Sequence, residues 1–242
     1  LMVTAMEAPV RFNADAVRNE KVKVLDAIRP LTTSQVTDAS VRGQYLGYLE
    51  EPGVRPGSNT ATFGAIRLEV DNWRWQGVPF YLRSGKAMSC RTTQIVIGFR
   101  QPPLELFAFD NPQSQREANR LVIQIQPAEG IQLHFHTKVP GDGMRLRLTD
   151  LEFSYSREFS GRLPEAYEPL LLDCMTGDAS LFARSDEVEK AWGIIDPFVQ
   201  SWGSDTTPSI PSYPQGNWGP AVSDTWMRTQ GRSWFDLCPV LR

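Results

Sequence analysis

The stretch from Val78 to Arg91 reads Val-Pro-Phe-Tyr-Leu-Arg-Ser-Gly-Lys-Ala-Met-Ser-Cys-Arg. An apolar and aromatic run ends here in Ser84-Gly85, and three cations, Arg83, Lys86 and Arg91, cluster around the turn. Glycine at the end of a strand lets the backbone approach a ligand closely, and the cations beside it suit a phosphate or a polyhydroxylated anion. The alternative is a solvated surface turn, because most lysine and arginine side chains are simply exposed.

On both sides of this stretch the sequence predicts strands. Short segments, several of them alternating between apolar and polar residues, are separated by turns rich in Pro, Gly and Asn. Few helices interrupt them, which favours a mostly antiparallel sheet. The predicted strands are Val41–Leu49, Thr60–Val70, Pro79–Arg83, Thr92–Phe99, Arg120–Gln126, Ile131–Lys138 and Arg145–Phe153.

Helices are predicted at Asn13–Ile28, from about Pro164 to Met175, and at Ser185–Trp202, the last with a possible break at Pro197. Residues 1–9 read as the end of a helix, and residues 203–223, rich in Gly, Ser, Thr and Pro, read as an extended arm packed on the body. The predicted fold class is α+β, with helices packed on one face of a large, mostly antiparallel sheet.

Length and composition favour one domain over residues 1–242. A formal net charge of −3 argues against nucleic acid as a partner, and no apolar run approaches the length that spans a membrane. The cysteines at positions 90, 174 and 238 fit neither a zinc pattern nor a disulfide framework. We therefore expect a reducing, cytoplasmic location.

Other titratable groups predict no metal site or second reactive centre. His134 and His136 share one side of a predicted strand but have no acidic or cysteine partner at a suggestive spacing. The run Asp186-Glu187-Val188-Glu189 reads as a solvated face.

Several stretches together resemble one family, in the family's order and over essentially the whole chain. The stretch at 78–91 is similar to the signature of the C-terminal domain of glucose-6-phosphate dehydrogenase. Further agreement comes from Asp-Ala-Val-Arg-Asn-Glu-Lys-Val-Lys-Val-Leu at 15–25, Arg-Gly-Gln-Tyr at 42–45, Ser-Asn-Thr-Ala-Thr-Phe at 58–63 and Tyr-Pro-Gln-Gly-Asn-Trp-Gly-Pro at 213–220.

This resemblance implies an α+β fold like the C-terminal domain of glyceraldehyde-3-phosphate dehydrogenase, and a homodimer or homotetramer built through the sheet. It implies that the full enzyme oxidises glucose 6-phosphate to 6-phosphogluconolactone with NADP in the pentose phosphate pathway. The sequence contains no Gly-x-Gly-x-x-Gly, and the family's catalytic His motif is absent. We therefore expect NADP to be bound mainly by a nucleotide-binding half outside this sequence, and this chain alone to be inactive.

By the same resemblance, Lys86 and Arg91 contact the sugar-phosphate substrate, and Gln126 lies near it. Gln126 could equally be a strand amide satisfied by backbone groups. Arg83 is expected to point away from the Lys86 side and to serve stability. The alternative function is a stand-alone, non-catalytic domain that binds a sugar phosphate or assembles with a full-length enzyme.

Overall fold

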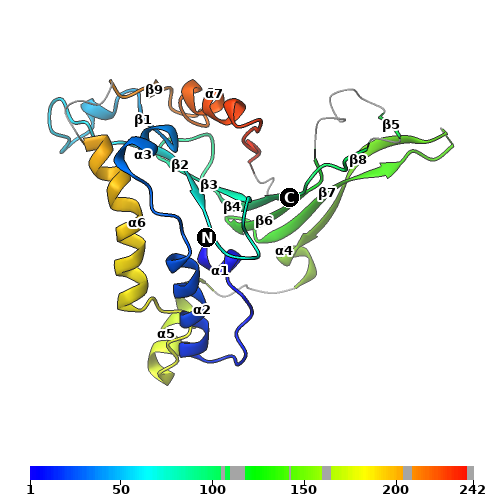
Figure 1. Ribbon diagram of the computed structural model, residues 1–242, viewed down its shortest axis with the longest axis horizontal. Coiled ribbons are helices and arrows are strands. Elements are labelled where there is room, and N and C mark those ends of the chain that lie inside the picture. Colours follow the sequence, from blue (N-terminus) through cyan, green and yellow to red (C-terminus); the bar gives the residue numbers. More distant parts are fainter. Residues whose placement is uncertain (105–106, 110–117, 142, 160–164, 204–208, 239–242) are drawn as a thin grey trace. The chain divides into compact units, whose positions relative to one another are not determined.

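The computed structural model describes residues 1–104, 107–109, 118–141, 143–159, 165–203 and 209–238. Along the chain the elements are α1 (Met2–Ala5), α2 (Ala14–Asp26), α3 (Thr33–Asp38), β1 (Ser40–Tyr45), η1 (Tyr48–Glu50), β2 (Phe63–Glu69), β3 (Pro79–Gly85), β4 (Thr93–Gly98), β5 (Ala108–Phe109), β6 (Arg120–Gln126), β7 (Gly130–Lys138), β8 (Arg145–Ser154), α4 (Tyr155–Glu158), α5 (Tyr167–Thr176), α6 (Ser185–Gly203), β9 (Ser212–Tyr213) and α7 (Ala221–Thr229) (Figure 1). In this part of the chain, no helix combines the length and the apolar character needed to cross a membrane.

The chain forms two compact units, one of Leu1–Ser89 with Pro164–Trp234 and one of Cys90–Leu163 with Phe235–Arg242. The first unit holds a four-stranded sheet in the order β3-β2-β1-β9, and the second a five-stranded sheet in the order β4-β6-β7-β8-β5. Neighbouring strands are antiparallel except in the short pairs β1–β9 and β5–β8. The predicted α+β class with mostly antiparallel strands is confirmed.

The strands are divided between two sheets and do not form the single large sheet that was expected. The division falls between β3 and β4, which are consecutive along the chain. The backbone between them does not close a hairpin: the amide of Lys86 donates to the carbonyl of Thr62, and that of Ser89 donates to the carbonyl of Asn217. The prediction of one domain over 1–242 stays a prediction.

The first unit buries its sheet beneath helices. Asn13 caps α2, its side-chain oxygen accepting from the Ala16 amide at 2.9 Å. Helix α6 runs beside α2 (Figure 1). The core between these helices and β2 is formed by side chains no more than 8 % exposed, among them Val24, Leu25, Ile66, Leu68, Val70 and Phe198.

A buried ion pair joins α2 to α6 and corrects the prediction of a solvated face at 186–189. The Lys21 ammonium lies 3.0 Å from the Glu187 carboxylate, and these side chains are 9 % and 5 % exposed. Asp186, in contrast, points to the surface and pairs with Arg184 at 2.7 Å. A run of acidic residues does not reveal which member will meet a cation on another helix, because that depends on how the helices pack.

The second unit carries an apolar sheet face, here defined by two rungs across four strands. One rung is Ile95, Ile123, Ile131 and Phe153, and the other is Ile97, Leu121, Leu133 and Leu151. Paired residues of an antiparallel ladder point to the same side, so all eight side chains share one face. Leu151 is 59 % exposed and Ile131 39 %. The opposite face is covered at its centre, where Val122 is fully buried.

Most predicted elements are confirmed, with boundaries within a few residues. Helix α6 does not break at Pro197 but runs through it, and the next residue, Phe198, is only 2 % exposed. Within the predicted 203–223 arm, residues 204–208 lie outside the described residues, and Tyr213 is packed in the core as expected. The arm ends earlier than predicted, because α7 begins at Ala221. Its start has no side-chain cap, which is the signal that would have marked it.

Candidate functional site

The cationic turn begins where β3 leaves the sheet. The last ladder pair is Phe63 with Gly85, and the amide of Lys86 then donates to the carbonyl of Thr62 at 2.8 Å. Gly85 packs closely here, since a Cβ on it would lie 2.6 Å from the Met88 sulfur and the Met88 side chain would have to shift. Ala87 then adopts a left-handed backbone with φ of +49°, which turns the chain sharply. The Lys86 side chain is exposed at this corner.

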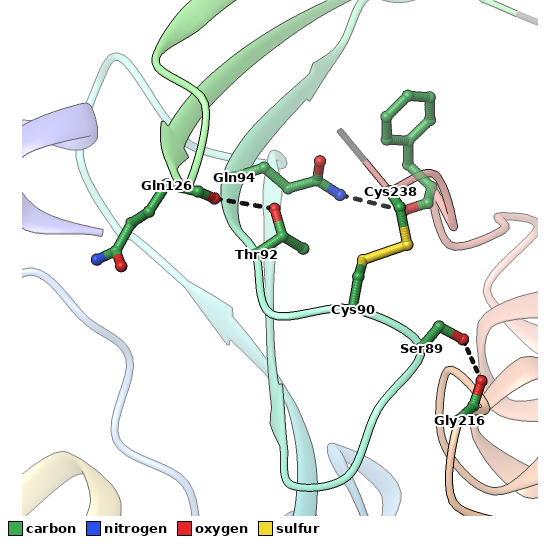
Figure 2. The surroundings of a disulfide bond; sticks show 8 residues. Ser89, Cys90, Thr92, Gln94, Gln126, Gly216 and Cys238 are labelled. Carbon is green, nitrogen blue, oxygen red and sulfur yellow. Dashed lines mark hydrogen bonds between the residues drawn. A yellow bond between two sulfur atoms is a disulfide. The ribbon is translucent and has the colours of Figure 1, made fainter. Parts of the chain in front are cut away.

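Residues 213–217, which we call the C-terminal clamp, hold this turn from the other side. The Tyr213 hydroxyl donates to the carbonyl of Lys86 at 2.7 Å, and the Gly216 amide donates to the carbonyl of Ala87 at 2.8 Å. Ser89 completes the contact, because its hydroxyl donates to the carbonyl of Gly216 at 2.5 Å (Figure 2). The turn that carries Lys86 is therefore fixed by a segment more than 120 residues further along the chain.

Arg83 lies on β3 itself, in surroundings that differ from those of Lys86. Its guanidinium carbon stands 4.5 Å from the ring centre of Trp234 and 5.2 Å from that of Trp218. A guanidinium stacked on two indole rings is stabilised by cation–π attraction. These contacts support the structural role expected of Arg83.

Arg91 and Gln126 belong to the second unit. Gln126 pairs with Thr93 at the end of the β4–β6 ladder, and its carbonyl accepts from the Thr92 hydroxyl at 3.1 Å (Figure 2). The structure thus places Arg91 two residues before the partner of Gln126, and both side chains are exposed. Lys86 lies in the first unit. A substrate site made of all three residues stays a prediction.

A disulfide joins Cys90 to Cys238, with the Cα atoms 6.0 Å apart (Figure 2). This corrects the prediction that the cysteines form no disulfide. A separation of 148 residues gives no signal in the sequence, and the pair meets because the segment that begins at Phe235 belongs to the second unit together with Cys90. In that packing Gln94 donates to the carbonyl of Phe235 at 3.3 Å, and the Phe235 ring lies 5.8 Å from that of His134. Cys174 is free and exposed.

The two histidines have separate partners. His134 Nδ1 lies 2.5 Å from an Asp150 carboxylate oxygen, and His136 Nδ1 lies 2.9 Å from the side-chain oxygen of Asn119. Among the residues that the structure describes, no group of three or more His, Cys, Asp or Glu is placed to hold a metal ion.

Tyr213 begins the segment 213–220 that resembles the family, but the sequence predicts no role for its side chain. The ring is 1 % exposed and stands edge-on to Phe63 with centroids 5.8 Å apart. Burial raises the pKa of the Tyr213 hydroxyl above its ordinary value, so the hydroxyl keeps the proton that it donates. A tyrosine in a motif shows only that an aromatic side chain is present, and its partner becomes visible only in the fold.

Comparison with known proteins shows the family of this chain. Residues 1–235 match the family model described as glucose-6-phosphate dehydrogenase, C-terminal domain. Glucose-6-phosphate 1-dehydrogenase of Rhizobium meliloti is 46 % identical over 249 residues, which cover 98 % of this chain and 50 % of that protein. The same enzyme of Treponema pallidum is 43 % identical over 244 residues, covering 97 % and 47 %.

Solved structures agree as well. Glucose-6-phosphate 1-dehydrogenase from Mycobacterium avium superposes with a TM-score of 0.80 at 34 % identity, covering 99 % of this chain and 48 % of that one. A glucose-6-phosphate dehydrogenase in complex with its substrate glucose-6-phosphate gives a TM-score of 0.85 at 33 % identity, covering 97 % and 48 %. The chain spans about half the length of the curated relatives that it matches. It belongs to the glucose-6-phosphate dehydrogenase C-terminal domain family.

Proposed function

We propose that this chain is the substrate-binding and dimerising half of an enzyme that oxidises glucose 6-phosphate to 6-phosphogluconolactone with NADP, at the entry of the pentose phosphate pathway. The observation that carries the proposal is the exposed Lys86 ammonium, presented at a turn whose backbone is fixed on both sides. A lysine held in this way offers a compact positive charge to a phosphate or a sugar oxygen. Family membership and the solved relative in complex with glucose-6-phosphate support the choice of substrate.

The described elements do not fit an NADP site of the common kind. Such a site uses parallel βαβ units with a Gly-rich turn that leads into a helix. The parallel pairs here, β1–β9 and β5–β8, are short: in each pair, two residues of one strand are paired with two residues of the other. We therefore assign NADP binding to the other half of such an enzyme, and give this chain only a role in holding the sugar phosphate.

Lys86→Ala, made in an enzyme that carries both halves, tests the assignment. Removing a charge that pairs with substrate in a partly desolvated pocket costs about 2 kcal/mol or more, so the KM for glucose 6-phosphate should rise roughly 30-fold or more. The KM for NADP should change little. Arg91→Ala should act in the same direction with a smaller effect, and Gln126→Ala is the third variant of the set.

Lys23→Ala is the matched control, since Lys23 is an exposed lysine with a local partner, Glu20, at 2.7 Å. It should leave both Michaelis constants unchanged. A KM for glucose 6-phosphate within about twofold of the parent in Lys86→Ala would contradict the assignment, because a lost charge contact costs more than that. The 242-residue chain by itself should not reduce NADP.

The apolar sheet face of the second unit is the proposed homodimer surface, and a homotetramer could be built from two such dimers. The two rungs contain no charged residue, although they extend across four strands. Three of the eight side chains, Ile131, Leu151 and Phe153, are exposed, and the other five are partly buried. Exposed apolar side chains grouped on one face are typical of an interface, and the family resemblance implies that the occupant is a second copy of this chain.

Ile131→Asp and Val96→Asp form a matched pair for this surface. Each residue is 39 % exposed, but Ile131 lies on the apolar sheet face and Val96 on the opposite face. Sedimentation should show a dimer for the parent and for Val96→Asp, and a monomer for Ile131→Asp. If both variants remain dimeric, the interface lies elsewhere.

We place the enzyme in the cytoplasm, the reducing location expected from its cysteine usage. Cytosolic thiols are normally kept reduced, so Cys90 and Cys238 provide the test. Rapid alkylation in the producing cells, followed by mass spectrometry, should find both residues as thiols there and as a disulfide after purification in air. A disulfide already complete in the cells would contradict the cytoplasmic assignment. The comparisons do not favour the alternative of a stand-alone, non-catalytic domain.

A further inference from the structure

The Tyr213 hydroxyl is a buried polar group with an ordered set of partners. The Tyr45 amide donates to the Thr62 hydroxyl oxygen at 2.9 Å, and that hydroxyl lies 3.2 Å from the Tyr213 oxygen. The Tyr213 hydroxyl has one proton, and its shortest contact, 2.7 Å, is to the carbonyl of Lys86. The carbonyl of Thr62 is a second, longer acceptor at 3.3 Å, and either hydroxyl of the Thr62–Tyr213 pair can be the donor.

Packing alone does not require this hydroxyl. Tyr213 belongs to a buried cluster with Val41, Phe63 and Ala65, where a phenylalanine would fill nearly the same volume. A buried hydroxyl is costly unless it is hydrogen-bonded. What it supplies here is a proton donor at the peptide that links Lys86 to Ala87, which is the point where the chain leaves the sheet.

That peptide follows directly on the Lys86 Cα, so a bond to its carbonyl helps to hold the stretch of backbone that carries the Lys86 side chain. The next residue, Ala87, has a positive φ, which an alanine retains only when the surroundings hold it there. The Tyr213 bond and the bond from Gly216 to Ala87 hold two successive carbonyls of the turn. Loss of one of these bonds lets the corner relax, and the ammonium at the end of a flexible four-carbon chain is then spread over more positions.

We propose that Tyr213 is a positioning residue for sugar-phosphate binding, and that it acts through its hydrogen bond to the Lys86 carbonyl within the C-terminal clamp. The proposal rests on the proposed function, because Lys86 must itself contact the substrate. Tyr213 does not touch the substrate. It restricts the positions of the Lys86 ammonium, which is the group that contacts the substrate.

A double-mutant cycle in the enzyme with both halves tests the proposal. Tyr213→Phe should raise the KM for glucose 6-phosphate roughly three- to tenfold, the range expected for one lost hydrogen bond, with a smaller change in kcat and none in the KM for NADP. In the Lys86→Ala background the same substitution should change the KM by less than about 1.5-fold, because there is no ammonium left to position. Tyr45→Phe is the matched control: its hydroxyl contacts Glu51 at 3.3 Å, and its loss should have no effect.

The outcomes separate the two hypotheses. If Lys86→Ala leaves the sugar-phosphate KM unchanged, the proposed function is wrong and the role of Tyr213 is overturned with it. If Lys86→Ala acts but Tyr213→Phe does not, or acts equally in both backgrounds, only the positioning role is overturned. Ser89→Ala removes the hydrogen bond from the Ser89 hydroxyl to the carbonyl of Gly216. Ser89 is exposed, so this substitution does not disturb the core. It should raise the same KM about twofold to threefold, and an unchanged KM would overturn the positioning role even if Tyr213→Phe does not fold.

Discussion

The sheets of the two units bury their apolar side chains to different extents. In the first unit β2 lies beneath helices, and Leu68 and Val70 are 3 % and 1 % exposed. In the second unit Leu151 and Ile131, which also lie on strands, are 59 % and 39 % exposed. Both sheets are rich in apolar residues, so composition does not distinguish them.

The two sheets differ in the elements that pack on them. In the first unit, residues of α2, α3 and α6 form one buried apolar cluster with residues of β2. The described part of the second unit contains a single short helix, α4, and the C-terminal segment that ends in Cys238, whose Phe235 packs near His134. The first sheet is therefore stabilised within the chain, whereas the apolar face of the second gains its full hydrophobic stabilisation only when another surface covers it.

The largest expected effect comes from truncating the same residue type in both sheets. Leu68→Ala should lower the free energy of unfolding by about 2–5 kcal/mol, because it removes a buried side chain and leaves a cavity. Leu151→Ala should cost less than about 1 kcal/mol in the monomer, because its side chain is already more than half exposed. Urea unfolding at low protein concentration measures both. Equal losses would remove the distinction between the units.

The disulfide gives the next effect, and it concerns the second unit alone. Cys238→Ser should lower the free energy of unfolding by about 2–4 kcal/mol in oxidised protein, since a cross-link between distant residues restricts the unfolded chain. The difference from the parent should vanish when a dithiol reductant is added. Cys174→Ser, at the free cysteine, is the control and should change nothing. Alkylation of unreduced protein should label one cysteine; labelling of all three would contradict the pairing.

The smallest effect is expected at an exposed ion pair of the first unit. Arg29 donates to both Asp71 oxygens, at 2.9 and 2.6 Å, and this lowers the pKa of the carboxyl below its ordinary value. A carboxyl whose pKa is lower in the folded state adds stability above its unfolded pKa and loses it as the pH falls through the folded value. Asp71→Asn should therefore be slightly less stable than the parent at pH 7 and equal to it in acid. A deficit that is independent of pH would show that the charge does not contribute.

The elements themselves could be predicted because their signals are local. Asn13 as a cap, the alternation along Arg120–Gln126 and the Gly-marked end of β3 are properties of a few adjacent residues. Lys86 could be proposed as a ligand for the same reason, since the cations stand next to the turn that presents them. The family resemblance added Gln126, which lies far from the turn in sequence.

Most of the missed features depend on distant partners, whereas the start of α7 was missed for a local reason. Glu187 is buried because Lys21 of another helix faces it, and α7 begins without the cap that a sequence can show. Cys90 pairs with Cys238 across 148 residues. The division into two sheets depends on where the backbone of 86–89 finds its hydrogen bonds, and those partners are Thr62 and residues 216–217.

For this protein, the sequence by itself determined the longer helices α2, α5 and α6, most of the strands, the family and the lysine proposed to meet the substrate. Side-chain periodicity and turn residues act over a few positions, so they can be recognised without the fold. Only the tertiary structure decided which strands share a sheet, which apolar face stays open and how the Lys86 turn is held. Each of those depends on hydrogen bonds and contacts between segments far apart in the chain. Tyr213 is an example, because the role proposed for its hydroxyl depends on the carbonyl of Lys86, which only the fold brings to 2.7 Å from it.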